Sequence, residues 1–333
     1  MFRTENIPFY LLTVALVATA SYVATKYKQA FTGEDDEYQL IRQYLLNDSP
    51  LYGKNRPKLW VHVPFELNAR NWKSFGSRTS TDLNEPYLEV LIQSIIRQCA
   101  SDFHICLIDD STFSKLIPSW DIDLPNIAEP MRSRIRELGE AELLHLYGGI
   151  WLPCSFICMR NLKELYDSTH SGTPLVGEIN TPYVSTSQYP FAPSMNIMCS
   201  RKGCPTMREL AKYLKTWCVA NSHFESQSEF LGTASNWCKS AIQANKMVLI
   251  SGDMLGVKTY KTKKPLLLEE WMEEADLDVA PNAWGIYVDN NEVLRRNRYN
   301  WLASISMDEL YGKSNAVLVR YMRKYCAKLS TER

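Results

Sequence analysis

Short apolar runs rich in β-branched and aromatic residues alternate with segments of helical period from residue 58 onward. The strand-like runs lie at 59–63, 103–108, 150–159, 174–178, 196–200 and 247–250, and the helical segments at 86–99, 130–147, 205–220, 226–244, 268–276 and around 318–325. A chain that alternates in this way buries its apolar faces as an α/β domain with a largely parallel sheet. Because no internal repeat or low-complexity tract divides this region, we predict one domain over residues 58–333.

Residues 7–25 precede this domain and carry no charged side chain. As a helix rising about 1.5 Å per residue, they would reach roughly 28 Å, close to the hydrocarbon thickness of a bilayer. The region before them contains both Arg3 and Glu5, and the apolar stretch is long for a signal peptide. We therefore expect a retained single-pass anchor in the lipid bilayer over 7–25, with a cleaved signal peptide as the alternative. Residues 26–57, acidic at first, are expected to form a stalk.

Charge and cysteine content exclude some classes of protein. The chain has 37 Lys and Arg against 37 Asp and Glu, so it lacks the basic excess of a nucleic-acid-binding protein, and we expect no nucleic-acid partner. Its 9 cysteines are dispersed and form no CxxC pair. That distribution favours reduced thiols over a disulfide framework. We therefore expect the bulk of the chain on a reducing side of the membrane, either cytosolic or inside a virion.

The most specific motif is Tyr-Gly-Gly-Ile-Trp-Leu at 147–152, and a Pro-Lys pair at 57–58 opens the first strand-like run. Over residues 57–200 these features resemble the glycosyltransferase families that carry a sugar-binding DxD motif, especially the capsular polysaccharide synthesis proteins. The resemblance implies a GT-A fold, in which a nucleotide-sugar lies across the C-terminal ends of the strands. The candidate cleft residues are His62, Asp109, Asp110, Glu137, Glu140, Tyr147, Gly148, Gly149 and Trp151.

The acidic motif of those families is missing from this chain. Two carboxylates would hold a divalent cation that neutralises the leaving diphosphate. Counted from the glycines, their positions are occupied by Pro153 and Ser155, neither of which has a carboxylate. The same families carry a helix of the type Ser-Asp-x-x-Arg before this motif. Counted back from Tyr147, its Asp falls on Glu137 and its Arg on Glu140, where the charge is reversed. We therefore expect a preserved scaffold without a metal site, and we predict no cofactor and no bound Mn²⁺ or Mg²⁺.

Other acidic positions are less specific. Literal D-x-D strings occur at 121–123 and 276–278, about as often as chance allows, and neither follows a strand-like run. Asp109 and Asp110 end the second strand-like run, where an open α/β sheet contacts ligands. They are candidates for binding a base or ribose, and a pair that initiates a turn is the alternative.

Two functions remain open. One is a glycosyltransferase-like protein that works without a DxD-bound metal, in which Arg132, Arg134 and Arg136, or a second arginine cluster at 295–298, would stabilise the diphosphate. The other is a non-catalytic GT-A-like structural or binding protein of a virion or assembly membrane, and a sugar-binding module without turnover lies between them. Three segments, Leu67–Arg70, Ile108–Trp120 and Glu137–Gly139, resemble uncharacterised proteins of large DNA viruses with algal or protist hosts. This resemblance extends from residue 58 to about 301 and implies a viral origin.

Overall fold

A computed structural model of the chain describes residues 56–63, 85–180, 191–220, 227–303 and 305–326. The chain divides into two compact units, Met1–Gln43 and Tyr44–Arg333, and every described residue belongs to the second. The predicted anchor at 7–25 and the predicted stalk as far as residue 55 lie outside the described residues. Within the described ranges, no helix combines the length and apolar character needed to cross a bilayer.

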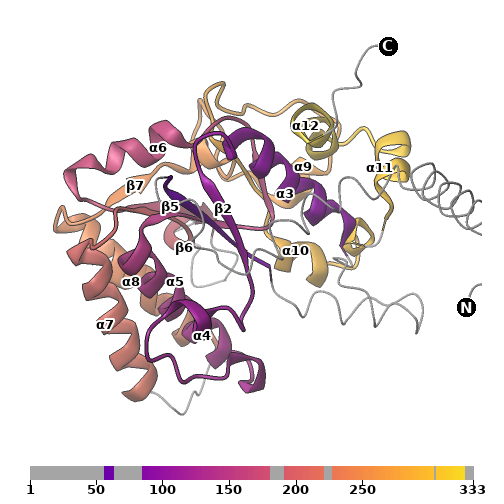
Figure 1. Cartoon of the computed structure of the whole chain (residues 1–333). Helices are drawn as coiled ribbons and strands as arrows, with labels where there is room; N and C mark the ends of the chain where they lie inside the picture. The colour runs from indigo at the N-terminus through magenta and orange to yellow at the C-terminus, as the bar shows by residue number, and fades with distance from the viewer. Residues whose placement is uncertain (1–55, 64–84, 181–190, 221–226, 304, 327–333) are drawn as a thin grey trace, which may run out of the picture. The chain divides into compact units, whose positions relative to one another are not determined.

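A six-stranded sheet with the order β2-β1-β3-β6-β5-β7 lies at the centre of the second unit (Figure 1). Its strands are β1 (Lys58–His62), β2 (His104–Ile108), β3 (Gly149–Pro153), β5 (Leu175–Asn180), β6 (Phe191–Ser200) and β7 (Val248–Ile250). β1 pairs in parallel with β2 and β3, and β5 pairs in parallel with β7, whereas β6 is antiparallel to both β3 and β5. Only β6 therefore runs against the others, which confirms the predicted α/β class and mostly parallel sheet.

A second sheet of two antiparallel strands, β4 (Phe156–Cys158) and β8 (Gly285–Tyr287), was not foreseen as a separate layer. The apolar run 150–159, predicted as one strand, is in fact β3 and β4 joined by a turn. Pro153 ends β3 because it has no backbone N–H to continue a ladder. The turn is tied to the end of β8, since Val288 N donates to Ser155 O at 3.0 Å.

Four long helices of the described residues lie where the hydrophobic period predicted them: α3 (Pro86–Cys99), α5 (Met131–Tyr147), α7 (Pro205–Ala220) and α8 (Gln227–Gln243). Shorter helices are α4 (Phe113–Leu116), α6 (Lys163–Asp167), α9 (Leu268–Trp271), α10 (Asn290–Arg295), α11 (Met307–Lys313) and α12 (Val317–Tyr325). Single 3₁₀ turns lie at Leu124–Asn126, Ser168–Ser171, Gly252–Leu255 and Asn300–Ala303. The acidic helix predicted at 268–276 already ends at Trp271.

Alternate residues of each central strand face opposite layers of helices. Trp60 and its register neighbour Trp151 belong to one continuous core with buried side chains of α5, α7 and α8. Leu59 and Val61, one residue out of phase, are fully buried on the other face. Figure 1 shows α3 and α12 on that other side of the sheet, away from α5 and α7. The helices thus cover both faces of the sheet and leave the strand ends as the place for a site.

Two glycines connect α5 to β3. Gly148 ends the helix at φ +68°, its N–H bonded to Leu144 O at 3.0 Å, and its carbonyl accepts from Trp60 Nε1 at 3.0 Å. Gly149 has φ +114°, and a Cβ built on it would lie 2.2 Å from Lys58 O in β1. Side chains other than hydrogen are therefore excluded at Gly149 both by conformation and by the closeness of the neighbouring strand. The motif at 147–152 is a structural requirement of this junction.

We expect Gly149→Ala in the full-length chain to lower the free energy of unfolding by about 3 kcal/mol or more, because the new methyl group meets the Lys58 carbonyl. Gly203→Ala is the matched control, since Gly203 also has positive φ, +76°, but open space around its missing Cβ. It should cost only about 1 kcal/mol. Urea denaturation followed by circular dichroism measures both; equal losses would show that backbone conformation alone sets the cost.

Candidate functional site

The structure brings the predicted site residues of three strands to one edge of the sheet. His62 is the last residue of β1, Asp109 and Asp110 follow β2, and Pro153 is the last residue of β3. In register, His62 lies opposite Ile108 on one side and Pro153 on the other. This is the C-terminal edge of the parallel strands, where open α/β sheets place their ligands.

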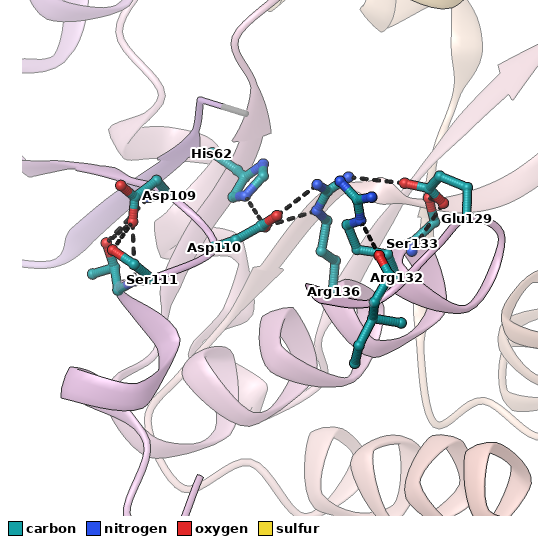
Figure 2. A network of polar contacts seen from close by, with 10 residues as sticks. His62, Asp109, Asp110, Ser111, Glu129, Arg132, Ser133 and Arg136 are labelled. Carbon is teal, nitrogen blue, oxygen red and sulfur yellow. Dashed lines mark hydrogen bonds and ion pairs between the residues drawn. The ribbon is translucent and has the colours of Figure 1, made fainter. Parts of the chain in front are cut away.

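Asp110 is the centre of a polar network at this edge (Figure 2). The guanidinium of Arg136, from α5, donates to it twice, from Nε to Oδ1 at 2.7 Å and from Nη2 to Oδ2 at 2.6 Å. His62 Nε2 lies 2.9 Å from Asp110 Oδ1. Burial would raise the pKa of the Asp110 carboxyl, but the hydrogen bonds from His62 and Arg136 outweigh it and hold that pKa far below its usual value. The carboxylate is therefore ionised and acts only as an acceptor.

A second carboxylate, Glu129, lies beyond Arg136 at the start of α5 (Figure 2). Its Oε2 accepts from Ser133 N at 3.2 Å and Ser133 Oγ at 2.6 Å, and its Oε1 lies 3.5 Å from Arg136 Nη1. Arg132, one helical turn before Arg136, donates from Nε to Ile127 O at 2.6 Å. Burial and the neighbouring Arg136 lower the pKa of Arg132. Two guanidinium groups thus lie side by side at this edge, and that of Arg136 faces two carboxylates.

The predicted arginine cluster does not act as one group. Arg134 points away from the other two, is 1% exposed and donates from Nη1 to Glu137 Oε2 at 2.6 Å. Glu140, at the family's Arg position, lies one helical turn from Arg136. Burial raises the pKa of Glu140 well above its usual value, Glu137 adds to the shift, and Arg136 opposes it. α5 therefore presents cations at its first turns and a carboxyl that favours its neutral form further along.

The two adjacent aspartates have different roles. Asp109 Oδ1 accepts from Thr112 N at 3.0 Å, from Thr112 Oγ1 at 2.7 Å and from Ser111 Oγ at 2.7 Å. These bonds form a turn that leads into α4, and in Figure 2 the Asp109 side chain points away from Arg136. Asp109 therefore initiates a turn, as the alternative interpretation of the pair predicted, whereas Asp110 belongs to the charged network.

The aromatic residues of the predicted cleft pack against His62 and α4 near this edge. Trp151 is buried and stacks on His62 with ring centroids 6.2 Å apart. Tyr147 donates from its hydroxyl to Leu116 O at 2.6 Å, which ties the end of α5 to α4. Gly148 and Gly149 form the helix-to-strand junction described above. These contacts position His62 and the strands, and they give the rings a packing role.

The positions that would carry the metal ligands are closed. Pro153 has no donor atom in its side chain, and Ser155 is 3% exposed within the turn between β3 and β4. Among the described residues, no three or more His, Cys, Asp or Glu side chains lie together as a metal site would require.

Sequence reasoning missed a buried acidic cluster beside this turn. Glu85, which immediately precedes α3, is 1% exposed, and its Oε2 has no hydrogen-bond partner among the described residues. Burial raises the pKa of Glu85 to about 7, although a hydrogen bond with Asn290 opposes the shift. Tyr87 donates its hydroxyl hydrogen to Asn290 Oδ1. Asp289, whose carboxylate caps α10, has a pKa raised by burial. No motif joins these residues, because Tyr87 and Asn290 are 203 positions apart.

Comparisons with known proteins give little further information. No family model matches the chain, and no curated protein sequence matches it. Among solved structures, the chain is similar to one described as the PaToxG glycosyltransferase, with 13% sequence identity over 68% of this chain and 81% of that chain, and a TM-score of 0.33. A likeness at this level does not establish a shared activity.

We expect Asp110→Asn to lower the free energy of unfolding by about 3 kcal/mol at pH 7, because Arg136 keeps its charge in a largely buried place without its counter-ion. The stabilisation from Asp110 is present above the pKa of an unfolded aspartate and is lost as the pH falls toward its low folded pKa. The difference between the wild type and the variant should therefore shrink below about pH 4. Asp123→Asn, an exposed carboxylate bonded to Asn126, should change stability by under about 0.5 kcal/mol. Urea titrations across pH test this; a constant difference would contradict it.

Glu85 should make the protein less stable as the pH rises. Its folded pKa of about 7 exceeds the unfolded value of 4.5, so its contribution is greatest below pH 4.5 and is lost by about pH 7. The expected loss is about 3 kcal/mol. Glu85→Gln keeps the side chain neutral, so its thermal midpoint should exceed that of the wild type at pH 8 and approach it below about pH 4.5. Glu164→Gln, at an exposed position, is the control. A wild-type midpoint that does not respond to Glu85→Gln at pH 8 would refute the assignment.

Proposed function

We propose that this chain is a membrane-anchored glycosyltransferase-like protein of GT-A type, of viral origin, with a degraded metal site. The observation that carries the proposal is the Asp110–Arg136 ion pair at the C-terminal edge of the parallel strands. A nucleotide-sugar would bind at that edge in an open α/β sheet. The sequence resemblance over residues 58–301 supports the viral origin, and the uncharged stretch at 7–25 supports the anchor.

A ligand at this edge would meet arginines instead of a metal ion. Pro153 cannot ligate a cation, and Ser155 is buried, so we propose that no divalent metal takes part. A diphosphate is instead expected to bind between Arg132 and Arg136, where guanidinium groups can stabilise its negative charge. Because Asp110 already binds Arg136 in bidentate fashion, the diphosphate would have to displace it. That competition predicts weak binding.

The same ion pair favours a second candidate, a non-catalytic structural or binding protein of a virion or assembly membrane. A cation that serves a leaving group must be available to that group when the bond breaks. Here Arg136 is 14% exposed and bonded through two nitrogen atoms to an ionised carboxylate. A site in which each charged side chain is paired with another can stabilise the domain without catalysing a reaction.

The compartment is also part of the proposal. All nine cysteines are free thiols, and eight of them are buried. We propose that the domain lies on a reducing side of the membrane, in the cytosol or the virion interior. Protease protection of the chain inserted into microsomes tests the side: cleavage of the domain without detergent is expected, and protection by the lumen would contradict it.

A binding measurement separates the two functions. The full-length chain in detergent is titrated calorimetrically with UDP- and GDP-sugars, with Mn²⁺ and with EDTA, and released nucleotide is followed. We expect binding that EDTA does not weaken and that Arg132→Gln lowers at least tenfold, or by about 1.4 kcal/mol. Arg208→Gln, an exposed arginine on α7, is the control.

Each result of this titration has a definite meaning. Binding without nucleotide release would support the non-catalytic candidate with a sugar ligand. If the folded chain binds none of the nucleotide-sugars tested, the result would support a structural protein and contradict the first proposal. Binding abolished by EDTA would contradict the metal-free arrangement.

A further inference from the structure

Two cysteines lie in contact between α3 and the small sheet. Cys99 is the last residue of α3 and Cys158 the last residue of β4, and their sulfur atoms are 3.8 Å apart. Both side chains are fully buried. Across the nine cysteines, all of which are described, this is the only pair with a sulfur–sulfur contact of hydrogen-bond geometry. The two positions are 59 residues apart in the chain, so the contact is created by the fold.

The backbone around the pair holds the two thiols against each other. Cys158 N donates to Ser94 Oγ at 2.8 Å, and Ser94 Oγ donates to Leu91 O at 2.6 Å, so the end of β4 is attached to α3 one helical turn before Cys99. β4 is in turn paired with β8 along its length. A disulfide needs sulfur atoms about 2 Å apart, so closing the pair requires a movement of roughly 2 Å.

The two thiols are chemically unequal. The hydrogen bond shared with Cys158 lowers the pKa of the Cys99 thiol, and the backbone of Leu162 adds to the effect against the opposing influence of burial. The Cys158 thiol itself donates to Arg160 O at 3.2 Å. Burial raises the pKa of Cys158 well above its usual value. Cys99 is therefore the better nucleophile of the pair, and Cys158 is placed to attack it in a second step.

A surface turn follows the pair in the chain. The chain leaves Cys99 through this turn, in which Ser101 is exposed and Asp102 partly exposed. Asn161, three residues after Cys158, closes this turn by donating from Nδ2 to Asp102 Oδ2 at 2.7 Å. Hydrogen bonds at an exposed turn open locally at a smaller cost in free energy than global unfolding. Because both sulfur atoms are buried, the reaction with an oxidant requires this turn to open.

We propose that Cys99 and Cys158 are a thiol–disulfide couple that a small disulfide such as oxidised glutathione converts to an intramolecular cross-link. The Cys99 thiolate attacks one sulfur of the small disulfide, forms a mixed disulfide and releases one small thiol. Cys158 loses its proton and attacks the Cys99 sulfur, which releases the second small thiol. Two protein thiols are oxidised to one disulfide, and one small disulfide is reduced to two thiols. The proposal does not depend on the ligand proposed for the strand edge, and in the reducing compartment proposed above the two cysteines are expected to remain thiols until a disulfide oxidant is present.

The cross-link would join the end of α3 to the strand that follows the Pro153–Ser155 turn. It would restrict the unfolded chain by closing a loop of about 60 residues, so the oxidised protein should be the more stable form. The strand-end turn and β4 would then remain attached to α3 even when local hydrogen bonds open.

The test uses the full-length chain in detergent, purified in dithiothreitol, freed of it and then exposed to oxidised glutathione. Remaining thiols are blocked with N-ethylmaleimide, and a non-reducing digest is analysed by mass spectrometry. We expect a peptide joining Cys99 to Cys158, the loss of two of the nine thiols, and a rise of roughly 5 °C in the thermal midpoint that dithiothreitol reverses.

Variants distinguish this pair from its neighbours. Cys158→Ala should abolish the cross-link and the rise in thermal midpoint, whereas Cys238→Ala, at another buried thiol, should preserve both. Cys326 lies close to Ser94 and Cys158, so Cys326→Ala should also leave the cross-link intact. A cross-link through Cys326, a stable glutathione adduct without a cross-link, or nine unchanged thiols in the folded wild type would each overturn the proposal.

Discussion

The strands β1 and β3 can pair as they do because Gly149 has no side chain at the point where their backbones meet. The missing side chain lets Lys58 O occupy space that any Cβ would fill, and this fixes the parallel pairing of the two strands. That pairing sets His62 opposite Pro153 and ends α5 beside β1, where Trp60 bonds to the Gly148 carbonyl. The site at the strand ends is therefore a consequence of backbone packing at the other end of β3.

Charge at the strand edge is balanced by protein groups alone. Asp110 and Glu129 both face Arg136, and the low pKa of the Asp110 carboxyl reflects how strongly its partners favour the ionised form. A divalent cation would add positive charge where the Arg132 and Arg136 guanidinium groups already lie. An anion would find Arg136 engaged by carboxylates and Arg132 bonded to the Ile127 carbonyl. This balance explains why the same network is compatible with weak anion binding and with a purely structural role.

The turn between β3 and β4 connects three features of the molecule. It contains Ser155, at a position where the sequence resemblance implies a metal ligand, and it is bonded to the end of β8 beside the buried Glu85 cluster. Through β4 it leads directly to Cys158 and its contact with Cys99. The buried Glu85, whose pKa is raised to about 7, and the Cys99–Cys158 pair are thus both close to the short segment formed by this turn and β4.

The α/β class, the long helices of the described residues and the glycine junction were predictable from the amino-acid sequence, because they follow from local period and from backbone conformation. The meeting of His62, Asp110 and Pro153 at one edge was also predictable, since the ends of parallel strands lie together. That Asp109 forms a turn while Asp110 binds Arg136, and that Glu85 approaches Asn290, became visible only in the folded chain. Those outcomes depend on distances between segments far apart in the chain, and side-chain charge is stabilised or opposed by neighbours that no spacing in the sequence reveals.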